Sequence, residues 1–421
     1  MQPYQWLVGV DWGSKLHRVC VLDGDGKQVA TRQVEHHGMG QREFVQWLSE
    51  LVGGRTSEVA VGIEIPRGAI VEGLQERGFA VFAINPKQLD RFRDRYGMGG
   101  AKDDGRDAFV LADSLRTDLH CFRRVLIEDA LILQIREMSR TRDDLQTEFG
   151  RLANQLREQL LRYFPPLLEL CPAADEPWLW DLLQMAPLPA QAAKLTGQRV
   201  SKLLANRRIR RLDPDQVRKI LKSPALVLAP GAEIAASKHA LLLLPSLRTA
   251  HAQHQQAVKE IAALVQLLPK PTGPEGQLLE HRDADLLLSL PGLGIGIAAT
   301  MLGEATRALV ERDYHALRCY SGLAAVTHQS GKRRTVVMRY ACNCRLRNAF
   351  YHWARCSMQR DPRSKQHYAQ LRQRGHSHGR ALRGVADRLL AVLMAVLRSR
   401  TPYDPKLRGL HAKHKPSEQQ P

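Results

Sequence analysis

The sequence has few cysteines, no long apolar run and few acidic residues in its last quarter, and each shortage excludes a class of protein. Its seven cysteines are scattered and odd in number, so no disulfide framework is expected. No apolar stretch approaches the roughly 20 residues that span a bilayer. A predicted strand begins almost at the first residue, without a basic and apolar signal region before it. We therefore expect a cytoplasmic protein with reduced cysteines and no membrane partner.

Acidic residues are scarce from Arg318 to the C-terminus, where 22 Lys and Arg stand against four Asp and Glu. This segment carries a net charge of +18, so the preceding 317 residues contribute only +1 of the total of +19. Arginine dominates the excess, and its guanidinium suits bidentate contacts with phosphates. A solvated basic surface is the simplest interpretation of any charge run. Over a hundred residues, however, the imbalance favours a nucleic-acid partner.

Four carboxylates are the most informative residues that the sequence does contain. Asp11 ends the apolar run 6–10, and Glu64 ends the apolar run 59–63. Asp104 and Asp107 lie three residues apart at the head of a predicted helix, so they share one of its faces. Each acid alone is ordinary turn or helix-start chemistry. Together they predict an oxygen-rich site for Mg²⁺ or Mn²⁺, suited to phosphodiester chemistry if the two strands are neighbours.

The first region, residues 1–122, has the pattern of an α/β domain. Strands are predicted at 5–11, 17–22 and 27–35, with a hairpin turn at 23–26. The pattern then alternates, with helices near 40–52, 67–77, 86–95 and 106–118 and strands ending at Glu64 and over 79–84. Three antiparallel strands followed by alternating helices and strands is the order of an RNase H-like domain, which places catalytic acids at the ends of its central strands.

Residues 123–280 are predicted to form a helical spacer. Heptad spacing over 126–163 indicates a long coiled-coil helix, and a second segment over 247–268 continues the pattern. The intervening residues 165–235 are mixed, with several prolines and the basic run 207–211. The two heptad segments are compatible with pairing inside one chain and with dimerisation, and the sequence leaves both open.

The third region, residues 281–400, is predicted to be mainly helical, with helices near 345–358 and 377–399. Gly292, Gly294 and Gly296 lie between helical patterns and resemble a helix-hairpin-helix turn, whose backbone N–H groups approach a phosphate. A glycine-rich turn between two packed helices is the alternative. The tail, residues 401–421, is rich in Pro, Lys and His and is expected to be disordered.

Together these residues resemble the DEDD transposases of bacterial insertion sequences, the IS110 family. The N-terminal resemblance lies in Gly-Val-Asp11, Glu64 and Lys-x-Asp104-x-x-Asp107-Ala. The C-terminal resemblance lies in the Pro-Gly-Leu-Gly-Ile-Gly turn, a Ser-Gly-Leu segment and a Ser-Gly-Lys segment, so that nearly the whole chain is covered. The resemblance implies a RuvC-like N-terminal domain whose four acids bind Mg²⁺, and a C-terminal transposase domain with a serine nucleophile.

The resemblance matches the nucleophile best to Ser330. This chain reads Gln-Ser330-Gly-Lys, one residue shorter than the Ser/Thr-Ser/Thr-Gly-Gly stretch of many relatives, and Ser321 is the second choice. Attack by Ser330 would give a covalent phosphoserine and conserve the bond energy for rejoining. Four cations are expected to contact nucleic acid near it: Lys332, Arg333, Arg334 and Arg339.

The resemblance also implies partners: DNA at the element ends and target, a structured guide RNA, and a homodimer or homotetramer in which one protomer's acids face another's serine. It places the enzyme on the bacterial nucleoid. Three alternatives remain open. A RuvC-like structure-specific endonuclease would use water instead of serine. The segment Gly9-Val-Asp-Trp-Gly-Ser14 also resembles the first phosphate loop of actin-like kinases, although no second loop or adenosine site is found. The third alternative is an inactive nucleic-acid-binding remnant.

Overall fold

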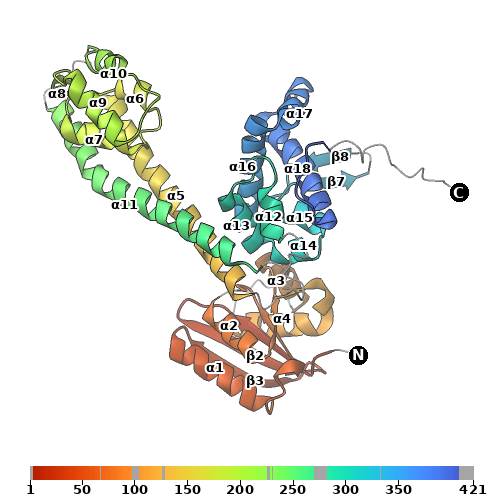
Figure 1. Ribbon diagram of the computed structural model, residues 1–421. Coiled ribbons are helices and arrows are strands. Elements are labelled where there is room, and N and C mark those ends of the chain that lie inside the picture. The colour runs from red at the N-terminus through yellow and green to blue at the C-terminus, as the bar shows by residue number, and fades with distance from the viewer. Residues whose placement is uncertain are drawn as a thin grey trace, which may run out of the picture. The chain divides into compact units, whose positions relative to one another are not determined.

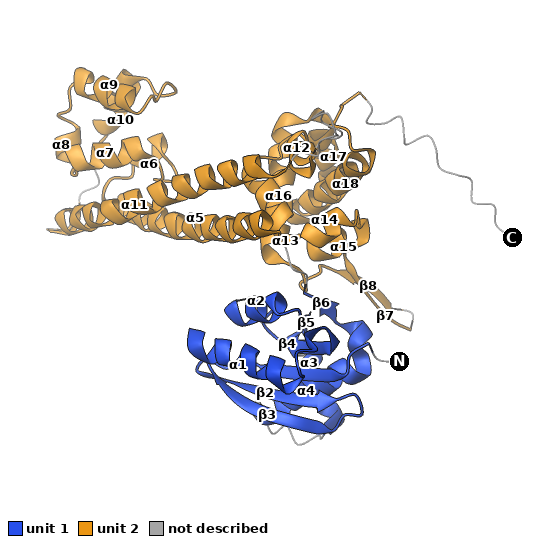
Figure 2. Cartoon of the chain, turned by 60° about the horizontal axis from the view of Figure 1, so that its bottom comes forward, with its two compact units in different colours: residues 1–128 blue, residues 129–421 orange. Residues whose placement is uncertain are grey.

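The computed structural model describes residues 3–66, 68–96, 104–125, 129–224, 228–229, 231–269, 282–331 and 333–406, with only the backbone for Lys87 and Asp104. The chain divides into two compact units, residues 1–128 and residues 129–421 (Figure 2). The predicted disordered tail beyond residue 406 and the predicted phosphate contact Lys332 lie outside the described residues.

Unit 1 is built on a six-stranded sheet in the order β3-β2-β1-β4-β5-β6 (Figure 1). Its central strands β1 and β4 are parallel, as are β4 and β5, whereas β2, β3 and β6 pair with their neighbours antiparallel. The three antiparallel strands expected at the start and the two later strands are confirmed. The short β6 was not predicted. The strands are β1 (Trp6–Asp11), β2 (Leu16–Asp23), β3 (Gln28–Glu35), β4 (Val59–Ile63), β5 (Ala80–Ala83) and β6 (Arg123–Arg124).

Helices cover both faces of this sheet, and each face has its own apolar core. Val8 and Val10 of β1 pack with α1 (Gly38–Leu51) and α2 (Ala69–Glu76) on one face. Leu7 of β1 packs with α3 (Pro86–Arg93) and α4 (Asp104–Asp118) on the other. Successive residues of a strand point to opposite faces, so this division follows directly from the sequence.

Two glycines let α4 lie close against the sheet. Gly9 of β1 and Gly62 of β4 are direct partners in the parallel register. A Cβ at Gly9 would lie 1.9 Å from the backbone oxygen of Ala108, and a Cβ at Gly62 would lie 3.2 Å from Leu115 Cδ1. The α4 residue Arg116 meets Gly26 in the β2–β3 turn, at the end of the sheet where β1 begins. The first turn of α4 therefore lies toward the carboxyl ends of β1 and β4.

Unit 2 contains two long helices, α5 (Ala130–Tyr163) and α11 (Ala232–Leu267), that lie side by side (Figures 1 and 2). They run antiparallel, because the start of α5 and the end of α11 share one core whereas the end of α5 and the start of α11 share another. The long helix predicted near 126–163 is confirmed. The second helix begins earlier than the predicted 247, because residues 232–246 also bury apolar positions at Ala236, Ala240 and Leu244.

Residues 164–222, which we call the cap, form a small helical bundle that packs on the far halves of the two long helices. Trp178 and Trp180 are fully buried in its core, and Trp180 Nε1 donates to the Ala174 oxygen at 3.0 Å. Sequence patterns marked this region only as mixed. Three of its prolines, Pro177, Pro189 and Pro214, begin helices, where a missing N–H costs nothing. The helices are α6 (Leu167–Leu170), α7 (Pro177–Met185), α8 (Pro189–Ala192), α9 (Gly197–Asn206) and α10 (Pro214–Leu221).

The remaining helices pack around Phe350, Trp353 and Leu389, in a core that also takes in Ile135 of α5 and Ile261 of α11. The long helices contribute to the cores at both ends, so these contacts do not mark a boundary between the predicted second and third domains. The three-domain division stays a prediction. None of the described helices combines the length and apolar character needed to cross a membrane. These elements are α12 (Asp283–Leu288), α13 (Ile295–Glu304), α14 (Thr306–Val310), α15 (Tyr314–Tyr320), α16 (Cys344–Arg360), α17 (Pro362–Gln373) and α18 (His378–Ser399), with strands β7 (Val326–Ser330) and β8 (Arg333–Val337).

We predict that Gly9→Ala destabilises unit 1 by at least about 1–3 kcal/mol, because the new methyl group meets the α4 backbone instead of a movable side chain. Chemical unfolding measures the loss. Gly38→Ala is the matched control, since nothing lies within 4 Å of its added Cβ. Equal unfolding midpoints for the two variants would contradict the close packing of α4.

Candidate functional site

Two of the predicted acids lie side by side at the carboxyl ends of the central strands. Asp11 is the last residue of β1, and Glu64 directly follows β4. Val10 and Ile63, the residues before them, are direct partners in the parallel register. By strand alternation Asp11 continues the face of Leu7 and Gly9, and Glu64 continues the face of Ala60 and Gly62. Both acids therefore point to the face that α4 covers, and both are partly buried.

The third described acid, Asp107, comes from the first turn of α4 and is only 2% exposed. Arg93, at the end of α3, holds its carboxylate with Nε 2.7 Å from Oδ1 and an Nη2 donor 3.0 Å from Oδ2. Sequence reasoning missed Arg93, because no local pattern shows which acid a helix-end arginine will meet. The fourth acid, Asp104, begins α4, but its side chain lies outside the described residues, as do Lys102 and Asp103.

The described acids do not yet form a closed cluster. Among the described side chains, no group of three that includes Asp11, Glu64 or Asp107 has its donor atoms within 4.8 Å of one another. Arg93 forms an ion pair with Asp107 and donates a hydrogen bond to Oδ2, whereas the buried Oδ1 accepts no hydrogen bond from a described residue. A buried carboxylate needs a positive partner, and a divalent cation supplies the same charge as a guanidinium. The all-oxygen donor set from two strand ends and the facing helix fits a hard divalent metal.

Behind the acids, on the other face of the sheet, a histidine clamp fixes the chain that leaves β1. The backbone N–H of Gly13 donates to Nδ1 of the fully buried His17 at 3.2 Å. His17 Nε2 therefore carries the ring proton, and it lies 3.0 Å from Nδ1 of His36. The Trp12 ring lies against both imidazoles, with centroids 4.6 and 5.2 Å away. Burial, and then the neighbouring His36, lowers the pKa of His17. The clamp thus favours the neutral form of His17.

The predicted nucleophile Ser330 lies in unit 2, at the end of a β-hairpin that the sequence analysis did not anticipate. Strands β7 and β8 pair antiparallel and are exposed almost throughout, and Ser330 pairs with Arg333 across the turn. Gly331 in the turn has φ +54, the left-handed region that a tight turn requires. Ser330 is therefore open to a large substrate.

The register of the hairpin decides which side chains accompany Ser330. Directly opposed residues of an antiparallel pair share a face, and so do alternate residues along a strand. His328, paired with Thr335, therefore shares the Ser330–Arg333 face. Arg334, paired with Gln329, lies on the other face. His328 is a second residue that the sequence analysis missed, because its relation to Ser330 depends on strand pairing.

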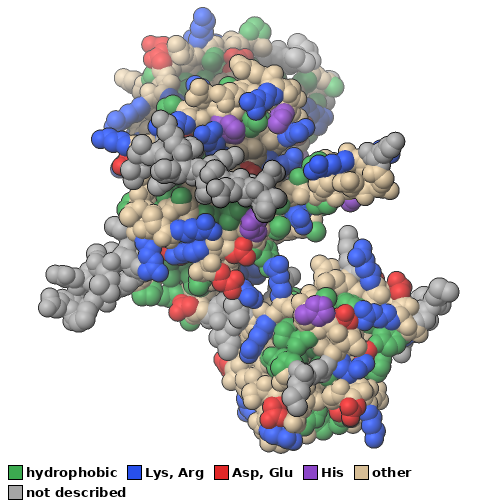
Figure 3. Space-filling model, turned by 90° about the vertical axis from the view of Figure 1, so that its right-hand side faces the viewer, with side chains coloured by type: hydrophobic (Ala, Val, Ile, Leu, Met, Phe, Trp, Pro, Cys, Tyr) green, Lys and Arg blue, Asp and Glu red, His purple; other side chains and the backbone are tan. Residues whose placement is uncertain are grey.

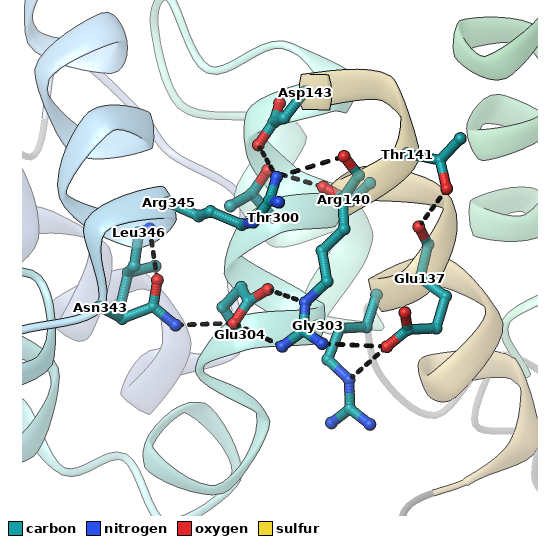
Figure 4. Close-up of polar contacts among 12 residues, drawn as sticks. Glu137, Arg140, Thr141, Asp143, Thr300, Gly303, Glu304, Asn343, Arg345 and Leu346 are labelled. Atoms are coloured by element: carbon teal, nitrogen blue, oxygen red, sulfur yellow. Dashed lines mark hydrogen bonds and ion pairs between the residues drawn. The ribbon is translucent and has the colours of Figure 1, made fainter. Parts of the chain in front are cut away.

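The root of the hairpin is anchored by a buried polar network (Figure 4). Asn343, just after the hairpin, donates to Glu304 Oε2 at 2.6 Å and caps α16 by accepting from the Leu346 N–H at 3.0 Å. Arg140 of α5 binds both oxygens of Glu304, at 2.6 and 3.1 Å. Burial opposes the charge of Glu304, but the hydrogen bonds from Arg140 and Asn343 outweigh it, and the pKa of Glu304 is lowered. The predicted contact Arg339 also lies at this root, with Nε donating to the Ala324 oxygen at 3.2 Å.

Several predicted residues have packing contacts in the structure. The second-choice serine, Ser321, is fully buried and its Oγ donates to the Leu317 oxygen at 2.6 Å. A Cβ at Gly292 would lie 2.5 Å from the Ser357 nitrogen, and a Cβ at Gly296 would meet Arg142. These two glycines thus allow close helix packing, whereas Gly294 has open space beside it. Nucleic-acid contact by the three glycines stays a prediction.

Comparison with known proteins decides the family. Residues 8–165 match the DEDD transposase family of IS110, and residues 284–369 match the transposase IS116/IS110/IS902 family. A mini-circle putative transposase for IS117 from Streptomyces coelicolor is 32% identical over 404 residues, which cover 94% of each chain. The chain belongs to the IS110 family of transposases. Membership makes it a DNA transposase, so that the kinase alternative has no support.

Further relatives agree with this assignment. A putative transposase of Sinorhizobium fredii is 50% identical over 206 residues, which cover 49% of this chain and 57% of that relative. An IS110 insertion-element protein of Streptomyces coelicolor is 28% identical over 413 residues, or 95% of this chain. The family's two matched segments contain the acids and the hairpin respectively, and a DEDD-type domain implies a divalent metal.

We predict that the clamp makes stability depend on pH. Because the folded pKa of His17 is lowered, its contribution is complete above the unfolded value of about 6.5 and is lost as pH falls toward the folded value. Chemical unfolding at pH 7.5 and 5.5 should show a smaller acid-induced loss for His17→Gln than for the parent chain. The exposed His239→Gln is the control and should behave like the parent. An unchanged loss in His17→Gln would contradict the clamp.

Proposed function

We propose that this transposase cleaves and exchanges DNA strands with Ser330 as its nucleophile and a Mg²⁺ site formed by Asp11, Glu64, Asp104 and Asp107. The observation that carries the proposal is the meeting of Asp11 and Glu64 at adjacent parallel strand ends, on the face where α4 brings the buried Asp107. This arrangement supports an RNase H-like, RuvC-like assignment for unit 1. Mn²⁺ has the same preference for oxygen donors and is the expected substitute.

When bound, Mg²⁺ would supply positive charge to the oxygens of the reacting phosphate. The residues of this chain prepare for it. Asp107 is buried and needs a cation, which Arg93 provides with its Nε 2.7 Å from Oδ1. Asp107 would hold the metal ion in place of Arg93, and the histidine clamp holds the chain after Asp11 through the Gly13 N–H. Arg93 would be left near the metal site, in reach of phosphate charge.

Ser330 would make and break the phosphorus bonds. Its Oγ attacks the scissile phosphorus, the Oγ–P bond forms, and one P–O bond of the DNA backbone breaks. The serine proton passes to a base, and the released DNA oxygen takes up a proton. Rejoining reverses these events, with a hydroxyl of another strand end displacing the serine. Arg333, on the same face of the hairpin, is placed to balance the phosphate charge, with Arg334 on the other face.

Guide RNA and oligomeric assembly are part of the same proposal. The net charge of +18 after residue 317 supports binding of more than one nucleic-acid strand. Apolar positions of α5 and α11 are buried within one chain, which supports the intramolecular choice for the predicted coiled coil. A dimer or tetramer would then associate through other surfaces.

In Figure 3, Lys and Arg side chains are spread across the visible face of the molecule.

We predict that Ser330→Ala abolishes covalent protein–DNA adducts, which denaturing gels detect as DNA label that migrates with the protein. Its loss of strand exchange should be at least about 10³-fold, as for other removed nucleophiles. Ser321→Ala is the matched control and should keep adduct formation, because its hydroxyl is buried and bonded to a helix carbonyl. Continued cutting by Ser330→Ala without adducts would favour the water-using endonuclease. Loss of adducts in Ser321→Ala alone would identify Ser321, and not Ser330, as the nucleophile.

We predict that Arg93→Gln lowers the free energy of unfolding in EDTA by about 3–5 kcal/mol, because Asp107 is left buried without a cation. Mg²⁺ should recover part of this loss, and its stabilising effect should exceed that on the parent chain. Arg95→Gln is the control, since its partner Asp118 lies outside the proposed site. If Mg²⁺ raised the free energy of unfolding equally in the parent and both variants, the proposal that Asp107 binds the metal would be contradicted.

A further inference from the structure

The cap carries a concentrated positive charge that the proposed chemistry does not use. Residues 194–222 contain ten Lys and Arg and only two acids, a net charge of +8. All other residues before Arg318 together have a net charge of −7. The charge is therefore a local feature of the cap and not part of a generally basic chain. Its cations are Lys194, Arg199, Lys202, Arg207, Arg208, Arg210, Arg211, Arg218, Lys219 and Lys222.

Most of these cations have no acidic partner among the described residues. Three are engaged: Arg207 binds Asp181, Arg211 binds Glu176, and Arg218 lies 3.5 Å from Asp215. The other seven are exposed, and none forms an ion pair with a described residue. Like charges held this close repel one another, and the repulsion is relieved when a polyanion binds.

The packing of the cap determines which residues of its helices face solvent. Helix α9 buries Val200, Leu203 and Leu204 in the cap core and exposes Arg199 and Lys202 on its outer face. Helix α10 buries Val217 and Leu221 and exposes Lys219. Between the helices, Ile209 packs against the core and leaves Arg208 and Arg210 exposed on either side of it. The cations thus project from a rigid, amphipathic surface.

The chemistry of this surface favours a double-stranded partner. Unpaired bases are usually recognised by stacking on exposed aromatic rings. The described aromatic residues of the cap are buried: Phe164 is 2% exposed, Trp178 is 0% exposed and Trp180 is 1% exposed. Lys and Arg without aromatic neighbours suit the phosphate backbone of a duplex. We propose that this surface of the cap, which we call the cap basic surface, binds the backbone of duplex DNA.

The cap basic surface is remote from the hairpin within unit 2. The cap core reaches along α5 as far as Phe149, whereas the core beneath the hairpin takes in Ile135. Fourteen helical residues separate these positions, or about 21 Å at 1.5 Å per residue. A duplex engaged at the cap is therefore contacted well away from the bond that Ser330 would cut. The inference goes beyond the proposed function and does not depend on the serine chemistry.

The experiment measures binding of the full-length protein to a fluorescein-labelled DNA duplex by anisotropy, in EDTA and over a range of salt concentrations. The cap variant is Lys202→Gln, Arg208→Gln and Arg210→Gln. The control variant removes the same charge from exposed positions of the long helices, Arg162→Gln, Lys238→Gln and Lys259→Gln. A labelled RNA hairpin is tested in parallel, and thermal unfolding confirms that both variants are folded.

The cap variant should bind the duplex at least about tenfold more weakly near 0.1 M salt, with a log–log salt slope smaller by about 2–3, as expected for three lost phosphate contacts. The control should change less than about twofold. If duplex binding weakened equally in both variants, the loss would follow from net charge alone and not from the cap basic surface, and the proposal would be overturned. Unchanged duplex binding, or a loss confined to the RNA hairpin, would also overturn it. Covalent adducts at saturating DNA report on Ser330 separately.

Discussion

The close contact between α4 and the central strands is the constraint on which the proposed metal site depends. Gly9 and Gly62 are paired across β1 and β4. The α4 backbone occupies the space that a side chain at Gly9 would fill, and the side chains of Ile84 and Leu115 occupy the space beside Gly62. If α4 packed farther from the sheet, Asp107 would lie farther from the strand ends that carry Asp11 and Glu64. The absence of a side chain at both glycines thus allows Asp107 on α4 to lie close to the ends of β1 and β4.

Charge compensation at Asp107 is the second constraint. A carboxylate as buried as Asp107 must have a cation beside it, and Arg93 is that cation in the structure described. Burial lowers the pKa of His17 and so disfavours a positive charge on the other face of the sheet. In the proposed site, a bound metal ion would replace Arg93 as the cation beside Asp107 on a scaffold that is already formed. In the second unit the Glu304–Arg140–Asn343 network likewise fixes the root of the hairpin and leaves its tip exposed.

The sequence was sufficient where structure is local and insufficient where it depends on tertiary contacts. Apolar runs with clear turns predicted β1 to β5, and their strand ends located Asp11 and Glu64. The pairing of Arg93 with Asp107 joins residues 14 apart on two helices and leaves no periodic signal. The β7–β8 hairpin was missed because its strands are exposed on both faces and so lack alternation. The cap was missed because prolines in a sequence usually indicate loops. In the structure, three of them occupy the first positions of α7, α8 and α10. The roles of the four acids and Ser330 remain proposals.

Direct location of the metal tests the central claim most sharply. Crystals of the protein soaked with Mn²⁺ would show its position by anomalous scattering. The account predicts a peak within coordination distance of Asp11, Glu64 and Asp107 oxygens, with the Asp107 carboxylate withdrawn from Arg93. A saturating Mn²⁺ peak elsewhere, with the Arg93–Asp107 pair intact and no density at the ends of β1 and β4, would contradict it.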